Sequence, residues 1–185
     1  MKTIDYYMSP SSPWTYLGHA RFAEIARRHG AQVEVKPVDF GVIFPQSGGL
    51  PLAKRAPQRQ AYRLVELRRW KECLGVPLVI QPKFFPVDAR PAAALIAGAP
   101  AGKRMALAGD LMAALWKDDR DLADPALLKE IGAKHAVAEA NNAQFDAYTQ
   151  EGLACGVFGA PSYVYRDEIF WGQDRLDFLD RALAK

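Results

Sequence analysis

The sequence predicts an α/β fold in which a strand–helix–strand unit opens the chain and a strand–strand–helix unit closes it. Three observations support this class: alternating strand and helix patterns in residues 1–40, a hairpin pattern with a following amphipathic segment in residues 155–185, and helical periodicity throughout most of residues 41–154. The chain has 185 residues, half of them apolar. This length is sufficient for one domain with a sizeable core and an insertion.

The first unit begins with the segment TIDYYM, residues 3–8, which predicts a strand ending at a turn rich in serine and proline. Ser12 followed by Pro13 is typical of a helix start, because serine caps free N–H groups and proline fits the first turn. Small and apolar residues then recur on one helix face, and Gly30 is a typical helix end. Residues 33–37 alternate apolar and polar side chains, which predicts the second strand.

The middle of the chain is predicted to be mainly helical. Residues 41–57 are rich in glycine and proline and are interpreted as a loop, and a helix is expected from residue 58 to 74 with Gly75 as its stop. Residues 76–86 are apolar but interrupted by prolines, which favours an ordered loop over a central strand. Further helices are expected over residues 89–97, 101–116, 125–131 and 142–154.

Strand patterns return at the end of the chain. Residues 162–165 and 169–171 flank a polar turn and predict a hairpin, after which Gln173 and Asp174 are expected to start a last amphipathic helix. This order of connections is that of a thioredoxin-like fold with an inserted all-helical subdomain. We expect residues 1–40 and 155–185 to form the thioredoxin-like domain and residues 41–154 the helical insertion.

Composition excludes several classes of function. The net charge is only +3, too small by itself to indicate a nucleic-acid-binding protein, and no apolar run is long enough for a membrane span or typical of a signal peptide. We therefore expect a cytoplasmic protein with neither a nucleic-acid nor a membrane partner. The three histidines show no metal-ligand spacing, so no metal site is expected. Cys73 and Cys155 form no C-x-x-C pair and are interpreted as buried, inert thiols.

The tetrapeptide Ser12-Pro13-Trp14-Thr15 lies where thioredoxin-like proteins carry their C-x-x-C motif, at the start of the first helix. Unpaired backbone N–H groups and the helix dipole favour an anion there. With serine in place of cysteine, the Ser12 hydroxyl can stabilise a thiolate that a ligand brings. The alternative is that Ser12 is only a helix cap, and this tetrapeptide alone favours that alternative.

Two further segments fit a bound thiol peptide. Pro161 precedes a strand at the place where thioredoxin-like proteins have a cis-proline, and the residue before it, Ala160, would offer backbone N–H and C=O groups to an extended peptide. In the segment Trp171-Gly172-Gln173-Asp174, the side chain of Asp174 can pair with the α-ammonium of a ligand. The N–H groups at the helix start can bind the α-carboxylate of the same ligand. An ordinary strand entry and an ordinary helix start are the alternatives for these two segments.

At these places the sequence resembles the 2-hydroxychromene-2-carboxylate isomerases, relatives of the kappa-class glutathione transferases in the DsbA-type thioredoxin superfamily. The resemblance extends over nearly the whole chain. It rests on SPWTYL from residue 12, RRW at residues 68–70 with GVPL from residue 75, GVFGAPS from residue 156, and WGQDRL from residue 171.

The resemblance implies a glutathione-dependent isomerase with Ser12 as the catalytic hydroxyl. It also implies that Ala160 and Pro161 hold the cysteinyl part of glutathione and that residues 171–174 hold the γ-glutamyl end. The implied reaction interconverts 2-hydroxychromene-2-carboxylate, or a related aromatic catabolite, with trans-o-hydroxybenzylidenepyruvate by reversible thiolate addition. The family further implies a homodimer and a small aromatic carboxylate as substrate.

Departures from the family concern the substrate side. Kappa relatives carry an asparagine where this chain has Gly49, and a lysine that Arg59 matches best; Lys83 falls where isomerase relatives contact substrate. Basic residues gather between Lys54 and Lys71 and are interpreted by default as a solvated face, although one or two can bind a carboxylate. Trp70, Trp116 and Phe158 are expected in the core. Two alternatives stay open: a kappa-like glutathione transferase, and a non-catalytic module that binds peptides.

Overall fold

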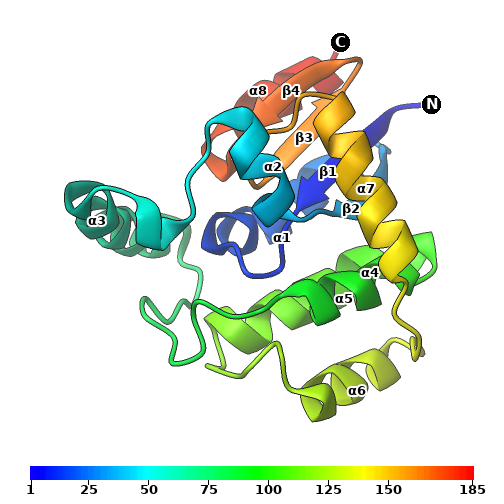
Figure 1. The fold of residues 1–185 in the computed structure, drawn as a ribbon. Coiled ribbons are helices and arrows are strands. Elements are labelled where there is room, and N and C mark those ends of the chain that lie inside the picture. Colours follow the sequence, from blue (N-terminus) through cyan, green and yellow to red (C-terminus); the bar gives the residue numbers. More distant parts are fainter.

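The computed structural model describes residues 1–185, which form a four-stranded mixed sheet surrounded by helices (Figure 1). The strands lie in the order β2-β1-β3-β4; β1 pairs with β2 in parallel and with β3 antiparallel, and β3 and β4 form the expected hairpin. Tyr6 in the centre of β1 lies opposite Val35 on one side and Tyr163 on the other. The strands are β1 (Thr3–Met8), β2 (Gln32–Pro37), β3 (Ser162–Tyr165) and β4 (Glu168–Trp171). This is the predicted thioredoxin-like α/β fold.

The helices agree with the sequence prediction except in two places. They are α1 (Pro13–Arg28), α2 (Phe40–Ser47), the 3-10 turn η1 (Leu52–Lys54), α3 (Pro57–Leu74), α4 (Arg90–Gly98), α5 (Ala101–Trp116), α6 (Pro125–Lys134), α7 (Asn142–Ala154), the 3-10 turn η2 (Gln173–Arg175) and α8 (Leu176–Leu183). The last predicted helix is divided, since Gln173 and Asp174 lie in the 3-10 turn that precedes α8.

The second difference is α2, in a segment that the sequence analysis interpreted as a loop. Asp39 caps this short helix by accepting a hydrogen bond from the Gly41 N–H at 2.7 Å, and Gly48 ends it in the left-handed conformation with φ 74°. Ile43 is buried in a cluster with Tyr7 and Val38. Glycine and proline lower the helix propensity of this segment, but the two caps and the burial of Ile43 stabilise the helix.

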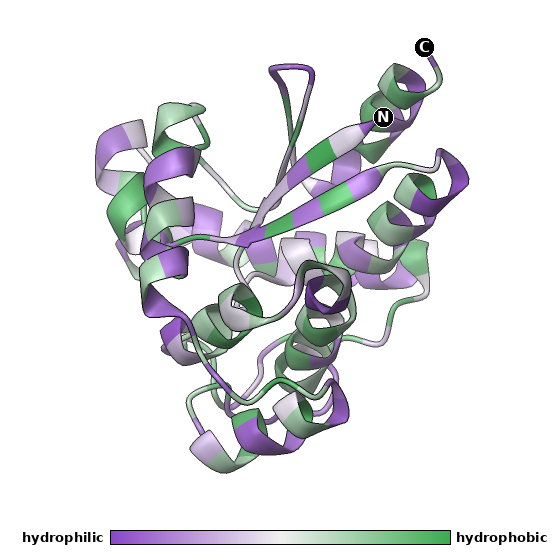
Figure 2. Ribbon diagram, turned by 90° about the vertical axis from the view of Figure 1, so that its right-hand side faces the viewer, coloured by the Kyte–Doolittle hydropathy of each residue, from purple (hydrophilic) through white to green (hydrophobic).

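Alternate residues of β1 pack on opposite faces of the sheet. Ile4 and Tyr6 belong to the main core with residues of α1 and α8, whereas Tyr7 faces the other side and packs beside Gly152 of α7. The main core also contains residues of α4, α5 and α6, so the helical middle shares one core with the sheet. Figure 2 shows hydrophobic and hydrophilic residues alternating within the helices, as helices with one buried face require. The boundaries at residues 40 and 155 remain a prediction.

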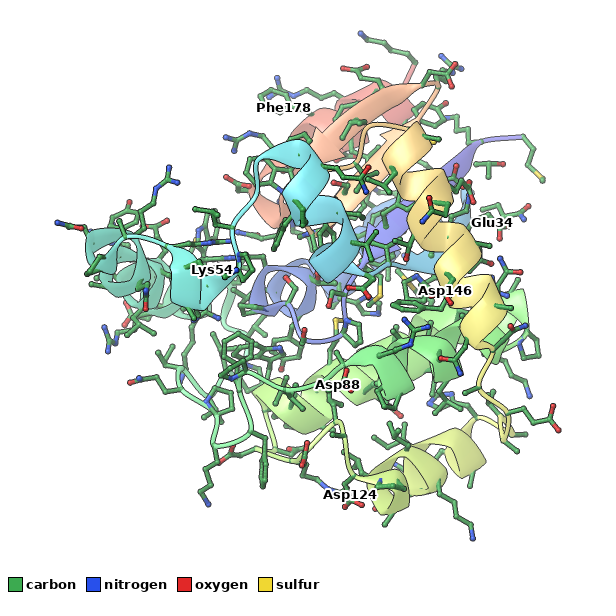
Figure 3. All side chains as sticks on the ribbon, viewed as in Figure 1. Glu34, Lys54, Asp88, Asp124, Asp146 and Phe178 are labelled. Atoms are coloured by element: carbon green, nitrogen blue, oxygen red, sulfur yellow. The ribbon has the colours of Figure 1, made fainter.

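A polar contact joins two helices of the middle of the chain. Arg90, at the start of α4, donates two hydrogen bonds to the carboxylate of Asp146 on α7, at 2.9 and 3.0 Å (Figure 3). Cys73 and Cys155 are both exposed, which corrects the expectation of buried thiols: Cys73 lies on an exposed face of α3, and Cys155 follows the last turn of α7. None of the helices combines the length and the apolar character that crossing a bilayer requires.

Candidate active site

A cavity of about 730 Å³ lies between two differently built walls. The sheet-side wall is formed by the turn before α1, the loop before β3 and the η2 segment: Ser9, Ser11–Trp14, Phe158–Ala160 and Trp171–Arg175. The α3-side wall comes from α2, the α2–α3 linker, α3 and the following loop: Phe40, Phe44, Ser47–Leu50, Leu52, Arg55, Arg59, Tyr62, Arg63, Glu66, Trp70 and Phe85. In Figure 1, α3 lies to one side of α1, and Lys54, labelled in Figure 3, marks the linker that leads to it.

Ser12 caps α1 and faces this cavity. Its Oγ accepts a hydrogen bond from the Thr15 N–H at 3.3 Å, and no acceptor in the chain takes its own O–H proton. The Trp14 N–H, in the first turn of the helix, also has no backbone partner. Two donors at the positive end of a helix are therefore free for an anion. Thr15, in the place of the second thioredoxin cysteine, is fully buried and packs beneath the turn.

The loop before β3 brings the backbone of Ala160 to the cavity. The Ala160–Pro161 peptide bond is cis, as the sequence analysis predicted, and Pro161 itself does not line the cavity. Neither the N–H nor the C=O of Ala160 forms a backbone hydrogen bond. The flanking residues are fixed, because the Ser162 hydroxyl donates to the Gly159 C=O at 2.7 Å and the Gly172 N–H donates to the Pro161 C=O at 2.8 Å.

The η2 segment supplies the acidic part of the sheet-side wall. Gly172 has φ 101°, a conformation that side chains disfavour, and this turn places Gln173 and Asp174 at the cavity. Gln173 is 2 % exposed, and its side-chain oxygen has no hydrogen-bond partner. Asp174 pairs with the neighbouring Arg175 at 2.5 Å and is partly exposed. A buried free acceptor beside a carboxylate suits an ammonium group.

Aromatic side chains form the mouth of the cavity. Trp171 is 51 % exposed and packs against Phe158, with ring centroids 4.8 Å apart. A Cβ atom at Gly159 would collide with the indole of Trp171, so glycine is needed for this close approach. Phe158 is 39 % exposed, which corrects its assignment to the core: its ring rests on Trp171 at the surface. Trp116 is fully buried as expected, while Trp70 is half-buried and also lines the cavity.

The α3-side wall carries three arginines at increasing depth. Arg59 is exposed, Arg55 is half-buried and donates from Nε to the Leu50 C=O at 2.8 Å, and Arg63 is 9 % exposed. Burial, and secondarily the charge of Arg55, lowers the pKa of Arg63 to about 10, so the guanidinium is still charged at neutral pH. The basic segment is therefore not a uniformly solvated face.

The structure brings nearly all the predicted site residues to one cavity. Ser12, Ala160, residues 171–174, Arg59 and Gly49 all line it, and Gly49 lies close against the ring of Phe44. Lys83 does not line the cavity: its N–H donates to Asp119 at 2.7 Å and its side chain is 82 % exposed. Sequence reasoning missed Phe40 and Phe44, for which the caps of α2 were the available signal.

Comparison with known proteins shows which family the chain belongs to. A family model described as a DSBA-like thioredoxin domain matches residues 3–184. The chain belongs to this family. Within the family its curated relatives are isomerases: it is 30% identical over 198 residues to a 2-hydroxychromene-2-carboxylate isomerase of Sphingobium xenophagum, covering 98% of both chains. A protein of the same name from Pseudomonas putida is 28% identical, with 98% of this chain and 94% of the relative covered. The chain is therefore an isomerase of the DSBA-like family.

Solved structures support the same fold. The structure of a 2-hydroxychromene-2-carboxylate isomerase is similar with a TM-score of 0.83 and 24% identity, covering 98% of this chain and 94% of that one. The cytosolic disulfide reductase DsbM of Pseudomonas aeruginosa, solved with GSH, is similar with a TM-score of 0.66 and 20% identity over 99% of this chain and the whole of the other. No group of three histidine, cysteine, aspartate or glutamate side chains is arranged to hold a metal ion.

Proposed function

We propose that the protein is a glutathione-dependent isomerase that interconverts 2-hydroxychromene-2-carboxylate, or a related aromatic catabolite, with trans-o-hydroxybenzylidenepyruvate. The observation that carries this proposal is the free Ser12 hydroxyl at the start of α1, in a cavity that contains no cysteine. The start of the first helix in a thioredoxin-like fold stabilises a cysteine thiolate, and this chain has Ser12 in place of that cysteine. The thiol therefore comes from a ligand.

The residues present fit glutathione. The free backbone groups of Ala160 suit the cysteinyl unit of an extended peptide, and Asp174 with the free Gln173 oxygen suits the γ-glutamyl ammonium group. Arg59 and Arg55 on the opposite wall suit the glycyl carboxylate. The cavity volume falls in the usual range for small-ligand sites, which is roughly 300–1,000 Å³.

The chain's own groups must favour the thiolate form. A thiol with a pKa near 8.5 is only a few per cent ionised at neutral pH, and lowering that pKa by about two units requires roughly 2.7 kcal/mol. The helix dipole supplies about 0.3–1 kcal/mol. A hydrogen bond from the Ser12 hydroxyl to a charged acceptor contributes about 1.5–3 kcal/mol, which makes up the difference.

Glutathione, when bound, supplies a nucleophile for reversible addition to a conjugated double bond, and this chemistry allows rotation about that bond without net oxidation or group transfer. Ser12 would offer its hydroxyl donor to the sulfur of the bound peptide. Ala160 and the η2 segment orient the peptide, and the aromatic residues of both walls exclude water from the reacting centre. The α3-side wall contacts the aromatic substrate.

The test is turnover of 2-hydroxychromene-2-carboxylate with and without glutathione, combined with calorimetry of glutathione binding. The proposal expects turnover that requires glutathione and leaves its concentration unchanged. Consumption of glutathione with formation of a stable adduct would instead identify a kappa-like transferase. No binding at millimolar glutathione would exclude both enzymes.

A further inference from the structure

Arg63 is a buried cation without a counter-ion. Its Nη2 nitrogen is buried and has no hydrogen-bond partner. Glu66, one turn along α3, is close enough in sequence to compensate it but pairs with Arg69 at 2.8 Å. Burying a charge without a partner costs several kcal/mol, so an arginine in this state is expected where a ligand supplies the missing anion.

The surroundings of Arg63 define the shape of that ligand. The guanidinium lies over the ring of Phe85, 4.9 Å from its centroid, and 5.9 Å from that of Trp116. Phe85 and Trp70 line the cavity beside it. Apolar rings beside a buried guanidinium suit a ligand that combines an aromatic ring with an acidic end, and the guanidinium is already oriented by stacking.

The other two arginines do not fill this role. Arg59 is exposed, and Arg55 already uses its Nε on the Leu50 carbonyl. Both are more accessible to solvent than Arg63 and suit the carboxylate of a peptide cofactor. Arg63 is the most buried of the three, so its partner must be a ligand that enters the aromatic interior.

We propose that Arg63 is the specificity-determining residue for the aromatic substrate, binding the carboxylate of an aromatic 2-oxo acid while Phe85 and Trp70 hold its ring. The inference rests on the proposed isomerase function for the identity of that acid. The proposed acid site does not need glutathione to be bound, because it is built from Trp116 and from residues of the α3-side wall other than Arg55 and Arg59, which are assigned to glutathione.

The test measures binding in the absence of glutathione. The probes are trans-benzylidenepyruvate, which lacks the ring hydroxyl needed for closure, and its neutral methyl ester. The wild type should bind the acid at least about 10-fold more tightly than the ester, the ratio that loss of one charge-assisted hydrogen bond produces. Arg63→Gln should bring the acid to the affinity of the ester, and Arg63→Lys should recover part of the difference. Arg68→Gln, an exposed arginine of the same helix outside the cavity, should change neither affinity.

Stability separates this role from a structural one. If Arg63 serves only to pack on Phe85 and Trp116, Arg63→Met should lower the free energy of unfolding. If Arg63 is an uncompensated cation in the absence of ligand, Arg63→Met should be at least as stable as the wild type in denaturant. Lowered stability, an unchanged acid-to-ester ratio in Arg63→Gln, or weakened glutathione binding in that variant would each overturn the inference. Absence of chromene carboxylate turnover with a normal acid-to-ester ratio would instead refute the proposed reaction and leave the anion site standing.

Discussion

The two walls of the cavity are built from different kinds of chemical group. The sheet-side wall presents backbone groups and capped turns: the start of α1, the Ala160 peptide and the η2 segment, each held by hydrogen bonds to the sheet or to its neighbours. The α3-side wall presents long cationic and aromatic side chains on a helix and its linker. Under the proposed function, this difference corresponds to a division of roles, in which the sheet-side wall holds glutathione and the α3-side wall holds the aromatic acid.

The strongest way to break this division is Ser12→Ala. We expect glutathione-dependent turnover to fall by about 10- to 150-fold, because the lost hydrogen bond to a charged acceptor is worth about 1.5–3 kcal/mol. The pKa of bound glutathione should rise, as measured by thiolate absorbance against pH. Binding of the aromatic acid at the other wall should not change.

The control for Ser12→Ala is another lost helix cap. Asp124 caps α6, away from the cavity, by accepting a hydrogen bond from the Ala126 N–H at 2.8 Å. Asp124→Ala should cost about 0.5–2 kcal/mol of stability, as Ser12→Ala does, without lowering turnover. Equal losses of turnover in the two variants would mean that Ser12 is only a cap.

A smaller effect is expected from Asp174→Asn. Its carboxylate is partly exposed and shared with Arg175, so its loss should weaken glutathione binding by only about 5- to 10-fold. Calorimetry measures this change directly. Asp177→Asn removes an exposed carboxylate in the first turn of the adjoining α8 that does not line the cavity, and it should leave glutathione affinity unchanged. Similar losses in both variants would indicate a general charge effect instead of a contact.

The smallest effect on either wall is expected from His19, a residue of α1 that does not line the cavity. Burial lowers the pKa of His19 from 6.5 to about 4, and its ring contacts the Met105 C=O at 3.0 Å and the Tyr6 hydroxyl at 3.3 Å. Because the unfolded chain binds this proton more readily, the stability present above pH 6.5 is lost as the pH falls towards 4, by at most about 3 kcal/mol. Chemical denaturation at several pH values tests this, and His19→Gln should flatten the dependence. An unflattened curve would assign the loss to other groups.

The sheet-side wall was the part that the sequence predicted well. Its signals are short sequence patterns. Ser12-Pro13 starts a helix, Ala160-Pro161 precedes a strand, and Gly172 permits a turn with a positive φ. These patterns depend on backbone conformation, which neighbouring residues largely determine.

The α3-side wall was predicted poorly because its chemistry depends on tertiary contacts. Arg63 follows a polar helical pattern that indicates solvent exposure, and only Phe85 and Trp116 from later segments bury it. The helix α2 was missed because its caps outweigh the low helix propensity of Gly41 and Pro45. On the sheet-side wall, the exposure of Phe158 was missed because an apolar side chain gives no sign of a surface partner such as Trp171.

All residues of the α3-side wall come from one uninterrupted stretch of the chain between β2 and α4. This has a consequence for the divergence of such enzymes. Residues 40–85 contain none of the turns that are proposed to hold the peptide, since those turns lie in other parts of the chain. Under the proposed function, changes confined to this stretch would alter the substrate range and leave the thiol-binding turns unchanged. A chimaera carrying a relative's version of this stretch would acquire that relative's preference for the acid.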